Sequence, residues 1–214
     1  MLDVILDSPL SPWLQHDIDA TDHIVISSRI RLARNFDGVL FTNRNDMSSL
    51  EKVNSISRSL LKPLKDVDGH QYSNINLEQL SERDRAILVE KHLMSPALEE
   101  KLPYRNLVVS DDASIVIMVN EEDHLRIQSM VSGLNLEVAY ERVLKIDKAI
   151  EVKYPYAFDE RFGYLTACPT NVGTGLRASV MLHLPALTIS GKITRLIRSI
   201  IQLGYSVRGL YGEG

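Results

Sequence analysis

The stretch 106–127 constrains the fold of this chain more than any other part of the sequence. Two runs rich in β-branched and apolar residues, 106–110 and 114–120, are separated by a short segment with two aspartates. Such a pair of runs around a polar break predicts a β-hairpin. A second acidic break follows at 121–123, and the chain then returns to apolar residues. We therefore expect adjacent antiparallel strands here, with three carboxylates gathered at one turn.

Amphipathic patterns predict helices on either side of these strands. Ser81 is a favourable N-cap for a helix that runs to about His92, and Ser95 before Pro96 suits the start of another short one. Apolar residues recur every three or four positions in three further segments, which are 46–61, 135–151 and 193–201. Further strand-like runs lie at 22–32, 178–184 and 205–211.

Hairpins beside long helices indicate an α+β fold with a largely antiparallel sheet flanked by helices. The 214 residues suit one large domain, with or without a small appendage. The sequence contains no internal repeat, no low-complexity linker and no clear domain boundary.

Composition excludes several classes of protein. The net charge of −4 argues against general binding to nucleic acid or to an anionic membrane surface. Cys168 is the single cysteine, which rules out an internal disulfide and fits a reducing compartment. There is no signal-peptide pattern at the N-terminus, and no apolar run approaches the roughly 20 residues that span a bilayer. We therefore expect a cytoplasmic, globular protein.

Five arginines lie in apolar sequence rather than in polar loops: Arg29, Arg31, Arg126, Arg177 and Arg208. Taken singly, each reads as a surface-strand arginine whose aliphatic stem is buried. Five of them together favour an anion, because unpaired buried guanidinium groups are costly and their forks match phosphate oxygens. A nucleotide triphosphate would suit them. The usual phosphate-loop and protein-kinase motifs are absent, and TNVGTGLR fits neither pattern.

Four motifs identify a family. In chain order, SSRIRLARN, VNEEDHLRI, TACPTNVGTGLRASV and VRGLYGEG closely resemble the ATP:guanido phosphotransferases, and among them the bacterial protein arginine kinases. The resemblance covers about 20–214 and implies a guanidino-kinase catalytic domain there, lacking its C-terminal part, after an N-terminal segment 1–19. It also implies ATP and Mg²⁺ as cofactors.

The resemblance assigns the nucleotide contacts position by position. His92 is among them, although a helix-end histidine satisfied by local hydrogen bonds is the alternative. The matching positions are Ser27, Ser28, Arg29, Ile30, Arg31, His92, Arg126, Arg177, Ala178, Ser179, Val180, Met181, Arg208, Gly209, Leu210, Tyr211, Gly212 and Glu213.

Carboxylates are implied on the acceptor side. Glu122 matches the family residue that holds the guanidinium and takes a proton, and Glu213 matches a second carboxylate across the substrate. Glu121 and Asp123 would be supporting acids, acting on magnesium through water. Cys168 matches a cysteine beside the guanidinium that orients the substrate, whereas a lone cysteine before proline is otherwise a packed small residue.

The expected reaction is ATP-dependent phosphorylation of arginine side chains in proteins. Kinases of small guanidines carry a helical domain before the first motif, whereas only 26 residues precede Ser27 here. That difference implies an open site. A kinase of a small guanidino compound, such as free arginine, and a non-catalytic nucleotide- or phosphoarginine-binding protein are the alternatives. By resemblance, a role in the stress response is expected, with a zinc-binding activator, a heat-shock transcriptional repressor and Clp protease components as partners.

Overall fold

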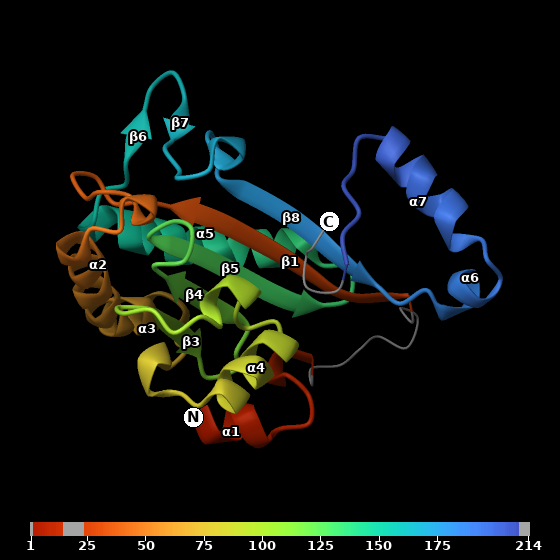
Figure 1. Ribbon diagram of the computed structural model, residues 1–214, viewed down its shortest axis with the longest axis horizontal. Helices are drawn as coiled ribbons and strands as arrows, with labels where there is room; N and C mark the ends of the chain where they lie inside the picture. Colours follow the sequence, from red (N-terminus) through yellow and green to blue (C-terminus); the bar gives the residue numbers. More distant parts are fainter. Residues whose placement is uncertain (1, 15–23, 210–214) are drawn as a thin grey trace.

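The computed structural model describes residues 2–14 and 24–209 of the chain. An antiparallel sheet of six strands forms its centre, in the order β2-β3-β4-β5-β1-β8 (Figure 1). The strands of this sheet are β1 Val25–Arg34, β2 Tyr72–Asn76, β3 Asn106–Ser110, β4 Ile115–Val119, β5 Leu125–Ser132 and β8 Leu176–Leu182. A separate two-stranded ribbon joins β6 Phe158–Asp159 to β7 Gly163–Tyr164. The predicted α+β fold with a largely antiparallel sheet is confirmed.

Helices flank the sheet on both faces. The α-helices are α1 Leu2–Asp7, α2 Met47–Ser59, α3 Leu61–Asp68, α4 Glu82–Glu90, α5 Leu136–Lys153, α6 Pro185–Ile189 and α7 Ile193–Gln202. Single 3₁₀ turns are η1 Pro12–Leu14, η2 Thr42–Arg44, η3 Leu77–Gln79, η4 Pro96–Leu98 and η5 Pro169–Asn171. No helix among the described residues is both long enough and apolar enough to cross a lipid bilayer.

One face of the sheet is covered by α2, α3 and α5. Ile30 and Leu32 of β1 pack there in one apolar cluster with Val143 and Ile146 of α5. On the other face, α1 and α4 pack in a second cluster that contains no described residue of β1 or β8. Figure 1 shows α5 crossing behind the sheet, while α1 and α4 cover the half near β3 and β4. No described residue of β1 or β8 therefore packs under the helices on this second face.

Several local predictions are confirmed. The runs 106–110 and 114–120 form the hairpin β3–β4. Ser81 caps α4, because its side chain accepts the Asp84 N–H and the Asp84 side chain accepts the Ser81 N–H. The helix expected over 46–61 ends earlier, at Ser59, and α3 follows it. Pro63 explains the break, since it has no N–H to donate to the carbonyl of Ser59.

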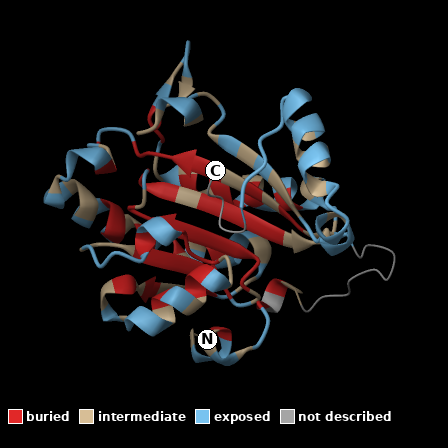
Figure 2. Ribbon diagram, turned by 45° about the vertical axis from the view of Figure 1, so that its right-hand side comes forward, coloured by how far each residue is buried: buried red, intermediate tan, exposed pale blue. Residues whose placement is uncertain are grey.

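The prediction of a strand over 205–211 is wrong for the residues that the structure describes. Residues 205–209 form no strand, and 210–211 lie outside the described residues. A strand requires a partner for its backbone hydrogen bonds, and β8 ends the sheet with no described strand beyond it. The helix α7, which precedes this segment, buries none of its residues (Figure 2).

The described part of the N-terminal segment, residues 2–14, packs on the sheet. Ile5 and Trp13 are buried in the same apolar cluster as Leu88 of α4. The Lys91 ammonium donates to the carbonyls of Ile5 and other residues of this segment. The predicted domain boundary near residue 20 falls in 15–23, outside the described residues, and stays a prediction.

Candidate functional site

Four of the five singled-out arginines share one face of the sheet. β1 lies between β5 and β8, so that Arg31 stands opposite Arg177 on β8, and Ala33 stands opposite Arg126 on β5. Arg29 stands opposite Ser179, whose Oγ accepts a hydrogen bond of 3.3 Å from the Arg29 Nε. Because alternate residues of a strand point to the same face, these arginines all project away from α5.

The positive charges of this arginine face lie close together and repel one another. Burial, followed by Arg126 and Arg177, lowers the pKa of Arg29 to about 10. The same causes lower the pKa of Arg31 to about 9, although Glu121 partly offsets them. The pKa of Arg177 falls through burial, then through Arg208 and Arg126. All remain cationic near neutrality, and an anion bound among them would relieve their repulsion.

His92 lies at the edge of this face. It has a left-handed backbone, with φ of 59°, and its carbonyl accepts the Gln128 side-chain amide at 2.9 Å. Burial, and then the charge of Arg29, lowers the pKa of His92. His92, Arg29 and Arg126 line one small hollow. The structure thus brings His92 beside the arginines.

Not every position matched on β1 and β8 projects to the arginine face. The Ser28 hydroxyl donates to the Gly133 carbonyl and accepts the Asn135 N–H, both at 2.8 Å, so it points towards the start of α5. Ile30 belongs to the apolar cluster under α5. On β8, the alternation places Ala178 and Val180 on that same side, leaving Arg177, Ser179 and Met181 with the arginines. The face therefore takes side chains from alternate positions only.

The last matched segment is described only in part. Arg208 and Gly209 are exposed. The matched positions Leu210, Tyr211, Gly212 and Glu213 lie outside the described residues.

The three acids of the turn between β4 and β5 have three different surroundings. Glu121 is held inside: its Oε1 lies 2.5 Å from Arg126 Nη1 and accepts the Ser95 hydroxyl at 2.7 Å. Burial alone would raise the pKa of Glu121, but Arg126, the Glu122 N–H, Ser95 and Arg31 lower it below its usual value. Glu121 is therefore ionised near neutral pH, and its carboxylate orients the Arg126 side chain.

Asp123 is a buried anchor. Its Oδ1 accepts the Asn35 side-chain amide at 2.6 Å and the Ala167 backbone N–H at 2.7 Å. Asn35 in turn donates to the Leu165 carbonyl and accepts the His124 N–H. Asp123 therefore ties the end of β1 to the loop that leads to Cys168.

Glu122 is the exposed member of the three acids. Its Oε2 lies 3.5 Å from the Asn171 amide at the end of η5, and its backbone carbonyl accepts the Thr42 hydroxyl. Cys168 is half-buried at the start of η5, with its Sγ 3.0 Å from Thr170 Oγ1. Glu122 and the turn that follows Cys168 are thus neighbours at the surface.

A cleft that the sequence did not reveal opens beside Glu122. Its volume is about 560 Å³. Glu121, Glu122 and Ala167 line one part, and the η2–α2 segment and the loop 102–105 form its walls. Glu121 and Glu122 belong to one motif and Ala167 to another, whereas the walls lie outside all four motifs, so no local pattern could have predicted that these residues meet.

A buried ion pair is a further feature that the sequence did not predict. Arg34 Nη2 lies 2.9 Å from Asp147 Oδ2 of α5, and both side chains are nearly inaccessible. Arg34 Nη1 donates to the Thr174 carbonyl, which fixes the glycine-containing loop before β8. A Cβ at Gly175 would meet the Ala33 carbonyl oxygen at 2.6 Å, so the close approach requires glycine.

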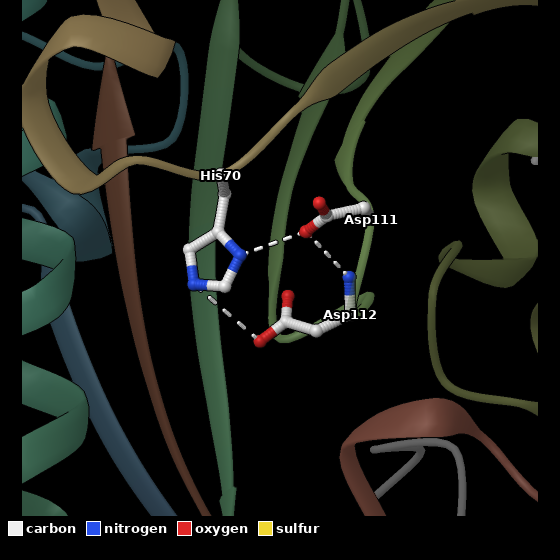
Figure 3. A group of neighbouring side chains, drawn as sticks. All are labelled: His70, Asp111 and Asp112. Carbon is white, nitrogen blue, oxygen red and sulfur yellow. Dashed lines mark hydrogen bonds and ion pairs between the residues drawn. The ribbon is translucent and has the colours of Figure 1, made fainter.

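A titratable cluster lies outside the four motifs and joins residues of the segments 68–72 and 110–114. His70 Nδ1 bonds Asp111 Oδ1 at 2.7 Å, and its Nε2 lies 3.8 Å from Asp112 Oδ2 (Figure 3). Each carboxylate also accepts a hydrogen bond from a backbone N–H, Asp111 from Gln71 and Asp112 from Ser114. We interpret this cluster as a clamp between the start of β2 and the β3–β4 hairpin.

Known proteins are similar to this chain in sequence and in fold. A profile described as ATP:guanido phosphotransferase, C-terminal catalytic domain, matches residues 52–214. A protein-arginine kinase of Syntrophomonas wolfei is 47% identical over 94% of this chain and 56% of its own length. A protein-arginine kinase of Shouchella clausii is 44% identical over the whole chain and 59% of its own length. The chain thus spans less than two thirds of these relatives.

Solved structures are also similar to this chain, among them the two that follow. The duplicated taurocyamine kinase from Schistosoma mansoni, with bound transition state analog components, aligns with a TM-score of 0.72 and 31% identity, over 97% of this chain and 29% of that one. A lombricine kinase aligns with a TM-score of 0.72 and 26% identity, over 97% of this chain and 59% of that one. The predicted guanidino-kinase catalytic-domain fold is confirmed.

Proposed function

This chain belongs to the ATP:guanido phosphotransferase family, and from that premise we propose that it phosphorylates arginine side chains of proteins with ATP. The observation that carries the proposal is the contact between Glu121 and Arg126, which joins the arginine face to the acidic turn. A cationic surface for an anionic donor thereby adjoins an exposed carboxylate, Glu122, for a cationic acceptor.

The arginine face is suited to the phosphates of ATP. Burial and the charges of neighbouring arginines lower the pKa values of Arg29, Arg31 and Arg177, so a polyphosphate would supply the anionic charge that this face lacks. Bound Mg²⁺ would neutralise phosphate oxygens, and it usually keeps several water ligands rather than a full set of protein groups. The side chains of this chain bind the donor and hold its γ-phosphoryl group in line.

Glu122 is proposed to hold the acceptor. A guanidinium is protonated up to a pKa above about 12, so its nitrogen is a poor nucleophile until a base takes a proton. The nitrogen attacks the γ-phosphorus, the N–P bond forms, the bond to the ADP oxygen breaks, and the proton passes to the Glu122 carboxylate. Asp123 positions the loop with Cys168 through Ala167, so that the thiol stays near the acceptor.

A kinase of a small guanidino compound is the second candidate, since both solved structures above are kinases named for such compounds. The names of the curated relatives favour protein arginine instead. The deciding experiment incubates the full-length protein with MgATP and either an arginine-containing protein or free arginine, followed by mass spectrometry for acid-labile phosphoarginine. Phosphoarginine in the protein alone supports the proposal, whereas equal kcat/KM for free arginine favours the second candidate.

We further propose a cytoplasmic location, a role in the stress response, and the partners implied by the resemblance. These are a zinc-binding activator, a heat-shock transcriptional repressor and Clp protease components. They stay predictions from the sequence motifs.

A further inference from the structure

The cleft beside Glu122 has walls that a guanidinium group alone does not need. Four residues on its two sides are apolar: Met47, Leu50, Leu102 and Pro103. Met47 is 52% exposed and Leu102 is 38% exposed, so neither is covered by the described residues. An apolar groove next to a carboxylate that would hold arginine offers room for residues beside that arginine.

Asn120 fixes the two walls of this cleft to each other. Its Nδ2 donates to the Leu50 carbonyl of α2 at 2.9 Å and to the Tyr104 carbonyl of the loop 102–105 at 2.8 Å. The residue is buried, with a left-handed φ of 56°, and directly precedes Glu121. The cleft is therefore braced from its floor and tied to the acidic turn.

The charges in the cleft favour a peptide over a free amino acid. Arg105, the cation of the lining, already donates from Nη1 to the carbonyls of Ala97 and Glu100, and from Nε to that of Asn120. Glu121 and Glu122 also line the cleft, so the α-carboxylate of free arginine would meet two carboxylates and one cation, whereas a peptide bond is neutral.

We propose, on the basis of the function proposed above, that this cleft binds the substrate polypeptide beside its target arginine and selects an apolar neighbouring side chain. Met47 and Leu102 form the exposed walls for that side chain. Glu122 holds the guanidinium itself, so the apolar walls determine specificity and not the chemical step.

The test uses the full-length protein and two arginine peptides that differ only next to the arginine, in leucine or in serine. In Met47→Glu and Leu102→Glu, we expect KM for the leucine peptide to rise about tenfold, while kcat and KM for ATP stay unchanged. The preference for leucine over serine should fall to near one. The matched control is Val152→Glu, since Val152 is 89% exposed on α5. An unchanged preference in both cleft variants would overturn the inference.

A binding measurement separates this inference from the proposed function. Fluorescence anisotropy of the labelled leucine peptide reports binding whether or not phosphate is transferred. If no phosphoarginine forms on any acceptor, the proposed function fails, and the anisotropy of the cleft variants still decides the inference. Met47→Ser and Leu102→Ser, which add no charge, replace the glutamate variants if circular dichroism shows that those do not fold. Equal peptide affinity in wild type, serine variants and control would exclude the cleft.

Discussion

Arg31 and Arg177 stand directly opposite each other on neighbouring antiparallel strands, β1 and β8. Like charges in this arrangement destabilise a sheet, and here both side chains are also partly removed from water. A fold that keeps such a pair trades stability for a binding surface. That relationship supports an anionic ligand more directly than the presence of either arginine alone.

Replacing Arg31 by methionine should separate stability from nucleotide binding. We expect Arg31→Met to raise Tm in the absence of nucleotide, because the repulsion from Arg177 and Arg126 disappears. The Kd for MgATP should rise about tenfold to a hundredfold, the scale of one lost charged hydrogen bond. Thermal denaturation with and without MgATP measures both effects. Arg142→Met, on the exposed side of α5, is the control; a lower Tm with unchanged ATP binding would contradict the prediction.

Glu122→Gln should remove the proposed base while preserving the surface for ATP. Turnover of an arginine-containing protein by the full-length enzyme should fall by roughly 10²–10⁴, the usual scale for general acid–base catalysis. The Kd for MgATP should change little, because Glu122 makes no described contact with the arginines. Glu141→Gln, an exposed glutamate on α5, should be as active as the wild type. Near-normal turnover in Glu122→Gln would exclude Glu122 as the base.

Cys168 offers a chemical probe, since it is the single cysteine of the chain. If the thiol lies beside the acceptor, an alkylating reagent should inactivate the full-length protein, and ATP together with substrate should slow the reaction. Cys168→Ser should lower activity and slow the inactivation by the reagent. Peptide mapping identifies the modified residue. Alkylation that occurs only after denaturation would assign Cys168 to packing alone.

The Arg34–Asp147 pair should be needed for folding. Asp147→Ala leaves the buried Arg34 guanidinium without its carboxylate, at a cost of about 3–5 kcal/mol in the free energy of unfolding. Urea denaturation monitored by circular dichroism measures it. Lys148→Ala, at the next and exposed position of α5, should cost far less. Equal stability of the two variants would show that the pair is dispensable.

The His70 clamp should make stability depend on pH. Burial lowers the pKa of His70, but the hydrogen bond to Asp111 and the charges of Asp112 and Asp68 raise it above its usual value overall. The clamp therefore stabilises the fold below the unfolded-state pKa of about 6.5 and loses this effect as pH rises through the folded-state value. His70→Gln should lower Tm more at about pH 5.5 than at about pH 8. An equal loss at both pH values would contradict the assignment, and His183→Gln, at an exposed position, is the control.

The sequence by itself determined the local features. The two-residue spacing of Arg29 and Arg31 places both on one face of any strand, and the structure has them there. The polar break within 106–120 determined a hairpin, and Ser81 determined the start of a helix, because turns and caps depend on neighbouring residues. The family followed from four short motifs, and the profile that matches residues 52–214 then confirmed the family.

Only the tertiary structure decided what each charged residue does. Glu121, Glu122 and Asp123 are consecutive carboxylates, yet Arg126 holds one, Asn35 and Ala167 hold another, and one is exposed. Spacing along the chain cannot separate them, because their partners come from other strands and loops.

The cleft and the arginine face are both formed by segments that lie far apart in the sequence. Asn120 braces Leu50 against Tyr104, and β1 inserts between β5 and β8, so segments more than a hundred residues apart meet at Arg31 and Arg177. The expected strand over 205–211 failed for the related reason that strands need partners. Side-chain type and periodicity act over a few residues, whereas burial, charge and pairing depend on which distant segments the folded sheet brings together.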